Sequence, residues 1–510
     1  MFYFLTHMID SKLAGLEIAM INRLKVFNYN KEKAKIVTFQ YNRFQHINTK
    51  KFGISDYNFL NMFDYFQEAT EFKLLSIQDN YISEILKKIA KTYPGFKKEC
   101  TGNLMNIYHK SIKVAEMSFF DNSLKYVSNL KWYGSDNEII RDDGYDSRGF
   151  LSISSFFGQK GGVSSETIYN IHGISVINLY YHEKSIGGDI ENTAITLKYH
   201  GVEQVFLNIE QLTAFFYDLV TNDDSDAIFI ADRSYLVDKP LFLMKNRPKI
   251  FEFWHNTFSS SNNKYGRFSD TMIEELCHPN LLSGYILPTE KGARDLKKRL
   301  PKNITVYNGT VALVSIIHEY NAHYNPNKII MVARIDRQKQ IDHGIKAFAL
   351  IHEKLPDAKL YIYGYIFDQE YNNELLELTR HLGLEKYIIF ENYTIDKESI
   401  YEDAAIMIMT SKNEGWGMVI NESLSYGVPV ISYDTCYGPA EIITNADDGY
   451  IVNINDYRSL SQKSIYILSH QSIRKSFAMR AINNMQRYNI ENVANIWKKL
   501  SIDMKTISNK

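Results

Sequence analysis

The chain has 510 residues, of which 45% are hydrophobic and 23% charged, and these proportions are typical of a globular protein. The length predicts two or three domains, because single hydrophobic cores rarely grow beyond about 300 residues. A formal net charge of −1 at pH 7 argues against nucleic-acid binding, which usually needs a basic domain or stripe.

Three cysteines, Cys100, Cys277 and Cys436, lie far apart in the sequence. Their isolation predicts a reducing compartment and argues against both a disulfide framework and a metal site. No apolar run is long enough to cross a bilayer, and residues 1–7 lack the basic lead of a signal peptide. We therefore expect an intracellular protein whose first residues form a β-strand.

The first 60 residues have the pattern of a βαβ unit. Apolar residues recur at helical spacing from residue 18 to 27, and residues 37–39 can form the next strand. Between the first strand and the helix, the loop at residues 10–15 ends at Gly15, where backbone can approach a ligand closely. This opening predicts a Rossmann-like domain.

From about residue 100 to 205 the sequence changes to short alternating segments, separated by turns rich in Gly, Asp and Asn. Such segments are typical of an antiparallel meander. Buried-strand patterns at residues 227–232 and 249–255 then resume the Rossmann-like domain. His255 stands at the end of the second strand, where such folds bind their ligands.

From residue 328 onwards strands and helices alternate, which predicts a parallel sheet with crossover helices. The strand that begins near residue 329 leads into a basic loop with Arg334 and Lys339. A guanidinium and an ammonium can stabilise the charge of a departing diphosphate, as a divalent metal does elsewhere. The alternative is an ordinary solvated basic loop.

Residues 411–422 are the most informative part of the sequence. An apolar strand at residues 404–410 leads into a glycine-bearing loop, and a short helix follows. Such a junction directs unpaired backbone N–H groups at one point, which suits a phosphate. Glu414 and Glu422 would repel that phosphate, so they more plausibly face hydroxyl groups. The combination indicates a nucleotide-sugar site.

Glu414 and Glu422, with seven residues between them, resemble the paired-glutamate motif of family 4 retaining glycosyltransferases, and the pattern continues in register to residue 452. The resemblance implies an α/β protein with the GT-B fold, in which two Rossmann-like domains face a cleft. The meander narrows it to Gram-positive enzymes that α-glycosylate teichoic acids or initiate O-glycosylation of serine-rich surface adhesins. In that group the β-sheet insertion contacts other subunits and helps to bind the polymeric acceptor.

The resemblance covers essentially the whole chain and implies four parts. They are an N-terminal Rossmann-like acceptor domain (residues 1–60 and 206–320), an inserted region that is largely β-sheet from about residue 100 (61–205), a C-terminal Rossmann-like nucleotide-sugar domain (321–485), and a helix that crosses back to the N-terminal domain (486–510).

The family's functional residues can be carried over to matching positions. The resemblance implies that Arg334 and Lys339 bind the donor diphosphate, that Glu414 holds sugar hydroxyls, and that His255 lies near the transferring sugar or the acceptor; we expect these four residues to be catalytic. The expected donor-binding residues are Glu422 at the ribose, Tyr393 beside the uracil, Gly15, and the backbone around Gly415, Trp416, Gly417 and Met418.

The sequence departs from the family pattern at three positions. Only Gly15 stands where the family often has two adjacent glycines. Glu252 occupies the position of a second histidine three residues before His255, and Ile366 occupies that of a second glycine after Gly364. These departures bear on the donor pocket and on the role of His255.

The predicted activity is transfer of N-acetylglucosamine (GlcNAc) or glucose from a UDP-sugar to Ser/Thr hydroxyls of a bacterial surface protein. Two alternatives stay open: α-glycosylation of a polyol-phosphate teichoic acid, and a catalytically silent subunit that binds acceptor for an active homologue. The silent subunit is disfavoured, because Arg334, Lys339, Glu414 and Glu422 are all present.

We expect no cofactor and no metal requirement. Asp224 and Asp226 resemble a short acidic metal signature, but they precede a strand and belong to a polar run that is typical of a solvated loop. The expected partners are the UDP-sugar, the acceptor, and either further copies of the chain or a homologous subunit, with no nucleic acid. The expected location is the cytoplasm, with peripheral association at the inner face of the membrane left open.

Overall fold

The computed structural model describes residues 1–70, 81–158, 161–183, 190–259 and 263–507. The chain divides into two compact units. The first comprises Met1–Leu13, Ala34–Phe229 and Tyr235–Pro248, and the second comprises Ala14–Lys33, Ile230–Ser234 and Lys249–Lys510.

The first unit contains three parallel strands in the order β1-β2-β3 and a large antiparallel sheet. The parallel strands and nearby elements are β1 (Phe2–Thr6), β2 (Ala34–Thr38), β3 (Phe59–Asn61), α2 (Gln45–Lys51), η1 (Asp56–Asn58), α3 (Met62–Phe66) and α5 (Ile209–Asp223). Two elements, β14 (Ile228–Ala231) and α6 (Ser234–Leu243), span the boundaries between the units.

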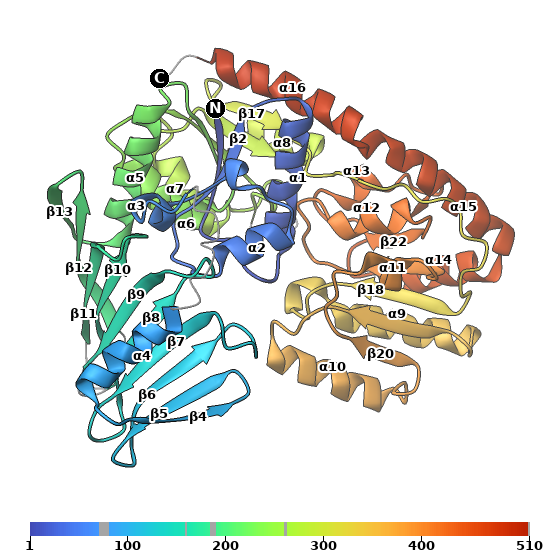
Figure 1. The fold of residues 1–510 in the computed structure, drawn as a ribbon. Helices are drawn as coiled ribbons and strands as arrows, with labels where there is room; N and C mark the ends of the chain where they lie inside the picture. Colours follow the sequence, from blue (N-terminus) through green and yellow to red (C-terminus); the bar gives the residue numbers. More distant parts are fainter. Residues whose placement is uncertain (71–80, 159–160, 184–189, 260–262, 508–510) are drawn as a thin grey trace. The chain divides into compact units, whose positions relative to one another are not determined.

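The antiparallel sheet has ten strands that neighbour one another in chain order, so the predicted meander is confirmed (Figure 1). Its strands are β4 (Lys97–Thr101), β5 (Leu104–His109), β6 (Ile112–Phe119), β7 (Val127–Tyr133), β8 (Ile139–Tyr145), β9 (Leu151–Phe157), β10 (Val163–Tyr169), β11 (Ser175–Glu183), β12 (Ile190–Tyr199) and β13 (Val202–Phe206). Helix α4 (Tyr81–Thr92) covers one face, because Ile85 and Ile89 pack with Met105 and Ile107 in one core cluster. Alternation of buried and partly exposed residues along β5 is expected for a sheet with one covered face.

The second unit contains three parallel strands and a six-stranded parallel sheet. The three strands and their helices are α1 (Gly15–Tyr29), β15 (Lys249–Phe253), α7 (Asp270–Cys277), β16 (Gly284–Leu287), α8 (Glu290–Lys297) and β17 (Thr305–Asn308). The larger sheet has the order β20-β19-β18-β21-β22-β23. Its strands are β18 (Lys328–Val332), β19 (Lys359–Tyr363), β20 (Ile388–Glu391), β21 (Ile406–Met409), β22 (Val430–Tyr433) and β23 (Gly449–Val452).

Helices connect and cover the strands of this six-stranded sheet (Figure 1). All four residues of β21 and of β22 are buried, as expected for strands of a parallel sheet with covered faces. Ile345, Phe348 and Ile351 on α9 (Ile341–Lys354) recur at helical spacing and pack on the same core. The helices from residue 337 to the end of the described chain are η2 (Arg337–Lys339), α9 (Ile341–Lys354), α10 (Gln369–His381), α11 (Lys397–Tyr401), α12 (Met418–Ser425), α13 (Pro439–Ile442), α14 (Tyr457–Ser469), α15 (Gln471–Asn484), η3 (Met485–Tyr488) and α16 (Ile490–Thr506).

The last helix, α16, packs against α1. The Asn30 side chain donates a hydrogen bond to the Ala494 carbonyl at 2.8 Å, and the Phe27 and Trp497 rings lie 5.7 Å apart. Among the described residues, no helix combines the length and the apolar character that a membrane span would need.

Candidate functional site

The predicted donor residues of the second unit lie at one edge of the six-stranded sheet. Arg334 follows β18, Tyr393 follows β20, and Glu414 follows β21. Since these strands are parallel, their carboxyl ends share an edge, and loops at that edge are where open α/β sheets bind ligands.

The basic loop and the glutamate loop are bonded to each other. The Asp336 side chain accepts a hydrogen bond from the Gln338 N–H and caps η2, while the Gln338 side chain donates to the Asn413 carbonyl at 3.0 Å. Lys339 Nζ lies 2.7 Å from Glu414 Oε1, and the two side chains are 17% and 13% exposed. The structure therefore brings Lys339 and Glu414, predicted from separate motifs, into one ion pair.

Arg334 remains accessible to a ligand. Its guanidinium pairs with Asp336 at 2.8 Å and lies over the Phe367 ring, yet the side chain is 35% exposed. Gly364, at the end of β19, allows this loop to approach, because a Cβ there would collide with the Ala333 carbonyl.

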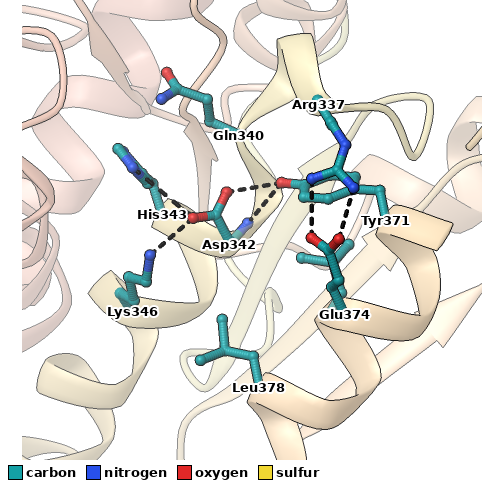
Figure 2. Close-up of a pocket in the computed structure, with 9 residues that line it drawn as sticks. Arg337, Gln340, Asp342, His343, Lys346, Tyr371, Glu374 and Leu378 are labelled. Carbon is teal, nitrogen blue, oxygen red and sulfur yellow. Dashed lines mark hydrogen bonds and ion pairs between the residues drawn. The ribbon is translucent and has the colours of Figure 1, made fainter.

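Arg337, in the same loop, is already paired with a glutamate on another helix. Figure 2 shows its guanidinium bonded to both carboxylate oxygens of Glu374 on α10, at 2.9 and 2.6 Å. A cavity of about 350 Å³ opens here between α9 and α10, and Asp342 lies in it, bonded to Tyr371 and Lys346. This cavity is therefore lined by charges that neutralise one another, and none of the predicted donor residues lines it.

The glycine loop leads directly into α12. Gly417 has a φ of 92° in the left-handed region and serves as the helix N-cap, so Met418 is the first helical residue. The first amides of a helix have no intrahelical partner and favour an anion. The Trp416 side chain is 4% exposed and its indole donates to Asn421, which leaves only its main chain available to a donor.

Glu422, on the first turns of α12, has two partners. Lys397 Nζ lies 2.6 Å from Oε1, and the buried Tyr401 hydroxyl donates to Oε2 at 3.1 Å. Tyr393 lies nearby, with its ring 6.0 Å from that of Tyr365; burial raises its pKa, and the neighbouring Glu422 charge adds to the effect. These contacts fix the orientation of the Glu422 carboxylate.

His255 is held by a buried acid. Its Nε2 lies 2.7 Å from Asp232 Oδ1, the other Asp232 oxygen accepts from Arg23, and the ring stacks on Phe253 at 4.2 Å. Burial opposes ionisation of Asp232, but Arg23 and His255 together hold the pKa of this carboxyl below its usual range. Burial lowers the pKa of His255 although Asp232 acts in the opposite direction.

This arrangement determines the chemistry of His255. Since a carboxylate can only accept, the neutral imidazole carries its proton on Nε2 and leaves Nδ1 as a hydrogen-bond acceptor. His255 also meets the glutamate loop, because a Cβ on Gly415 would collide with the His255 carbonyl oxygen. The predicted His255 and the predicted glycine loop are thus direct neighbours.

Gly15 is the exposed first residue of α1. The Glu17 carboxylate accepts from the Ala14 N–H at 3.0 Å and caps the helix beside it. A Cβ on Gly15 would meet nothing within 4 Å, so the fold itself does not require a glycine at this position.

Comparison with known proteins agrees with this geometry. Residues 315–484 match the family model described as "Glycosyl transferases group 1". This segment is a glycosyltransferase domain of group 1.

Two curated relatives match most of the chain. The poly(ribitol-phosphate) alpha-N-acetylglucosaminyltransferase of Staphylococcus aureus is 22% identical over 526 aligned residues, covering 98% of this chain and 99% of that protein. The UDP-N-acetylglucosamine--peptide N-acetylglucosaminyltransferase GtfA subunit of Streptococcus agalactiae is also 22% identical, covering 86% of this chain and 85% of that protein.

Solved structures identify the fold. The pneumococcal O-GlcNAc transferase GtfA, solved in complex with UDP and GlcNAc, aligns with a TM-score of 0.83 at 17% identity over 99% of both chains. A chain of the GtfA/B complex aligns with a TM-score of 0.81 at 17% identity, over 99% of this chain and all of that one. The predicted GT-B fold with an antiparallel insertion is confirmed.

The sequence did not identify three residues of the candidate site: Asp232, Lys397 and Tyr401. Asp232 has a signal, because it ends an apolar run that forms β14, where Rossmann folds place functional groups. Lys397 and Tyr401 have none, since nothing in the spacing of α11 predicts that it contacts α12.

Proposed function

We propose that the chain is a retaining glycosyltransferase that moves GlcNAc or glucose from a UDP-sugar to serine or threonine hydroxyls of a bacterial surface protein. The observation that carries this proposal is the Lys339–Glu414 ion pair at 2.7 Å, set beside Arg334 and the N-terminus of α12. At this edge of the sheet, cations and backbone amides can bind a diphosphate. A carboxylate at the same edge can accept hydrogen bonds from sugar hydroxyls.

The reaction breaks the bond between the anomeric carbon and the diphosphate oxygen, leaving an oxocarbenium-like sugar. Arg334, Lys339 and the amides near Met418 stabilise the charge that develops on the diphosphate, and we propose that they do so without a divalent metal. Glu414 orients the sugar through its hydroxyls, while Glu422 binds the ribose. The acceptor hydroxyl attacks the same face, and its proton passes to the leaving phosphate.

The glutamates do not need to form a covalent intermediate. Retaining glycosidases place two carboxyl groups about 5 Å apart on opposite sides of the bond that breaks. Here the two acids belong to one loop and the helix that follows it, and each is paired with a lysine. Such acids suit binding of hydroxyl groups on one side of the donor.

A surface protein is favoured as the acceptor by a cavity of about 330 Å³ in the first unit, lined in part by Tyr41, Asp142 and Glu166. Glu166 accepts hydrogen bonds from Ser155 and Tyr181. Arg43 also lines this cavity, and its guanidinium donates hydrogen bonds to the Ser128 carbonyl and to the Asn129 side chain. An acceptor bound there would therefore meet two carboxylates and one guanidinium, a net negative charge that repels phosphate, while the carboxylates accept hydrogen bonds from hydroxyl groups.

The second candidate acceptor is a polyol-phosphate teichoic acid. The observation in its favour is the S. aureus relative, named for poly(ribitol-phosphate), which aligns over nearly the full length of both chains. A catalytically silent subunit is disfavoured, because the four donor residues Arg334, Lys339, Glu414 and Glu422 are present and three of them converge at one edge.

We also propose assembly into a homo-oligomer or with a homologous subunit. The GtfA relative is named as a subunit, and a solved complex contains GtfA and GtfB. The proposed location is the cytoplasm, where Cys100, Cys277 and Cys436 stay reduced, with peripheral contact to the inner face of the membrane.

The test is release of UDP by the purified chain from UDP-GlcNAc and from UDP-glucose, with a serine-rich peptide or a polyol-phosphate polymer as acceptor. Glu414→Ala and Lys339→Ala should each slow release by roughly a hundredfold or more, whereas Arg337→Ala, the matched control in the same loop, should retain it. Turnover with the peptide supports the first acceptor and turnover with the polymer the second. No binding or turnover of either donor would support the silent subunit.

A further inference from the structure

The segment that follows β22 is bonded to the loop that carries Glu414. The Tyr437 N–H donates to the Glu414 carbonyl at 2.8 Å, and the two residues form an isolated parallel bridge. Gly438 then lies so close to Trp416 that a Cβ would collide with the Trp416 carbonyl. The backbone of the glutamate loop therefore follows any movement of residues 437–438.

Three residues further on, the same segment reaches a helix from an earlier part of the chain. Glu441 Oε1 accepts the Glu290 N–H at 2.8 Å, and Oε2 accepts the Lys291 N–H at 3.4 Å. These are the first two amides of α8, and the Thr289 hydroxyl accepts the third, from Gly292, at 3.2 Å. A carboxylate at this position also complements the positive end of the helix dipole.

This cap is unusual, because its carboxylate comes from a residue about 150 positions away rather than from the helix's own N-cap. A second, aromatic contact joins the same segment to a residue that follows β15: the Tyr437 and Phe258 rings lie 5.7 Å apart at an interplanar angle of 25°. On the other side of the glutamate loop, Gly415 abuts the His255 carbonyl. The loop thus lies between His255 on one side and residues 437–438 on the other.

We infer that Glu441 is a positioning residue for the proposed transfer: its carboxylate holds the start of α8 to residues 437–441 and so fixes Glu414 against His255. The expected effect on catalysis rests on the proposed function, whereas the contact between Glu441 and the start of α8 does not depend on it. Glu441 is only partly buried, and it needs no contact with the donor to act in this way.

Three variants distinguish a role of Glu441 in positioning the glutamate loop from a role in folding. Glu441→Ala removes both hydrogen bonds and the charge. Glu441→Gln removes the charge but keeps one side-chain oxygen that can accept a hydrogen bond from a backbone N–H of α8. Glu290→Gln is the matched control, because the Glu290 side chain is 66% exposed and does not cap the helix. Thermal unfolding of each variant shows whether it is folded.

In the kinetic arm, Glu441→Ala should lower kcat about tenfold, since small displacements of a catalytic group cost on the order of tenfold to a hundredfold, and KM for the UDP-sugar should stay within about twofold. Glu441→Gln should recover part of the loss, and Glu290→Gln should match the unchanged chain. An unchanged kcat in a folded Glu441→Ala variant would overturn the inference.

The second arm, hydrogen–deuterium exchange, needs no turnover. In the unchanged chain, UDP should protect both residues 411–418 and the start of α8; in Glu441→Ala, it should protect only the former. Equal protection of α8 in both proteins would overturn the inference. If the unchanged chain releases no UDP from any donor, the proposed function fails by itself. Exchange without UDP then decides whether Glu441 couples the two segments: in Glu441→Ala, both the start of α8 and residues 411–418 should exchange faster than in the unchanged chain, and unchanged exchange of residues 411–418 would overturn the inference.

Discussion

Two charged clusters in the second unit differ in how far water and ligands can reach them. The Lys339–Glu414 and Lys397–Glu422 pairs are partly exposed, and the Lys397 side chain is 48% exposed. In the Arg23–Asp232–His255 cluster, by contrast, the Asp232 side chain is fully buried and the His255 side chain is 12% exposed.

The difference indicates different roles. A partly exposed ion pair contributes little to stability, so a ligand can replace one partner at a small cost. A buried pair cannot be opened so easily, because loss of one member leaves an uncompensated charge away from water. We therefore expect substitutions in the Lys339–Glu414 and Lys397–Glu422 pairs to lower mainly activity. Substitutions in the buried cluster should lower mainly stability.

The largest expected effect is on turnover at the partly exposed Lys339–Glu414 pair. Glu414→Ala and Lys339→Ala should each lower kcat by roughly a hundredfold to a thousandfold, the usual loss when one preorganised charge is removed. The free energy of unfolding should change by less than about 1 kcal/mol, because the pair is not fully buried. Steady-state kinetics and urea unfolding test both parts, and a Lys339→Ala variant with near-normal kcat would remove Lys339 from the mechanism.

The opposite pattern is expected at Asp232. Asp232→Ala leaves Arg23 buried without this partner and should lower the free energy of unfolding by about 3–5 kcal/mol. His255→Gln, the comparison variant, keeps the Arg23–Asp232 pair and should lose much less. Urea unfolding at neutral pH measures both, and equal stability of Asp232→Ala and the unchanged chain would contradict the proposed role of burial.

A smaller effect concerns pH. The unfolded chain protonates His255 near its ordinary pKa of about 6.5, whereas burial lowers the pKa in the folded chain. The unfolded state therefore binds more protons as the pH falls through about 6.5, and the His255 contribution to stability, fully present above that pH, is lost below it. The fall in stability between about pH 7.5 and 5.5 should be reduced in His255→Gln but not in His323→Gln, where an exposed histidine is replaced.

Much of the second unit follows from local sequence. Continuous apolar runs predicted β18 and β21, and the glycine loop before α12 lies where expected, because these features need only neighbouring residues. The family resemblance selected Arg334, but charge and position in the loop alone do not distinguish it from Arg337, since the difference depends on Glu374, which lies 37 residues beyond Arg337 on α10.

Contacts distant in sequence were predicted least. Asp232 and His255 are 23 positions apart at the ends of different strands, and Glu441 meets α8 across about 150 positions. No periodicity or spacing in the sequence predicts which distant loops of the second unit come together. Only the three-dimensional structure shows that the residues flanking the motif fix its position.

The smallest expected effect tests whether Tyr401 only orients Glu422 or acts on the chemical step. Tyr401→Phe removes one hydrogen bond to Oε2 while Lys397 still holds Oε1, so the carboxylate stays charged and paired but is less firmly oriented. KM for the UDP-sugar should rise about fivefold, consistent with loss of one hydrogen bond worth about 1 kcal/mol, and kcat should not change. Tyr426→Phe is the control, because that ring packs on Tyr401 at 5.4 Å and has no hydrogen bond to Glu422 in the described residues. A fall in kcat with unchanged KM would instead mean that Tyr401 acts on the chemical step, and that Glu422 does more than bind the ribose.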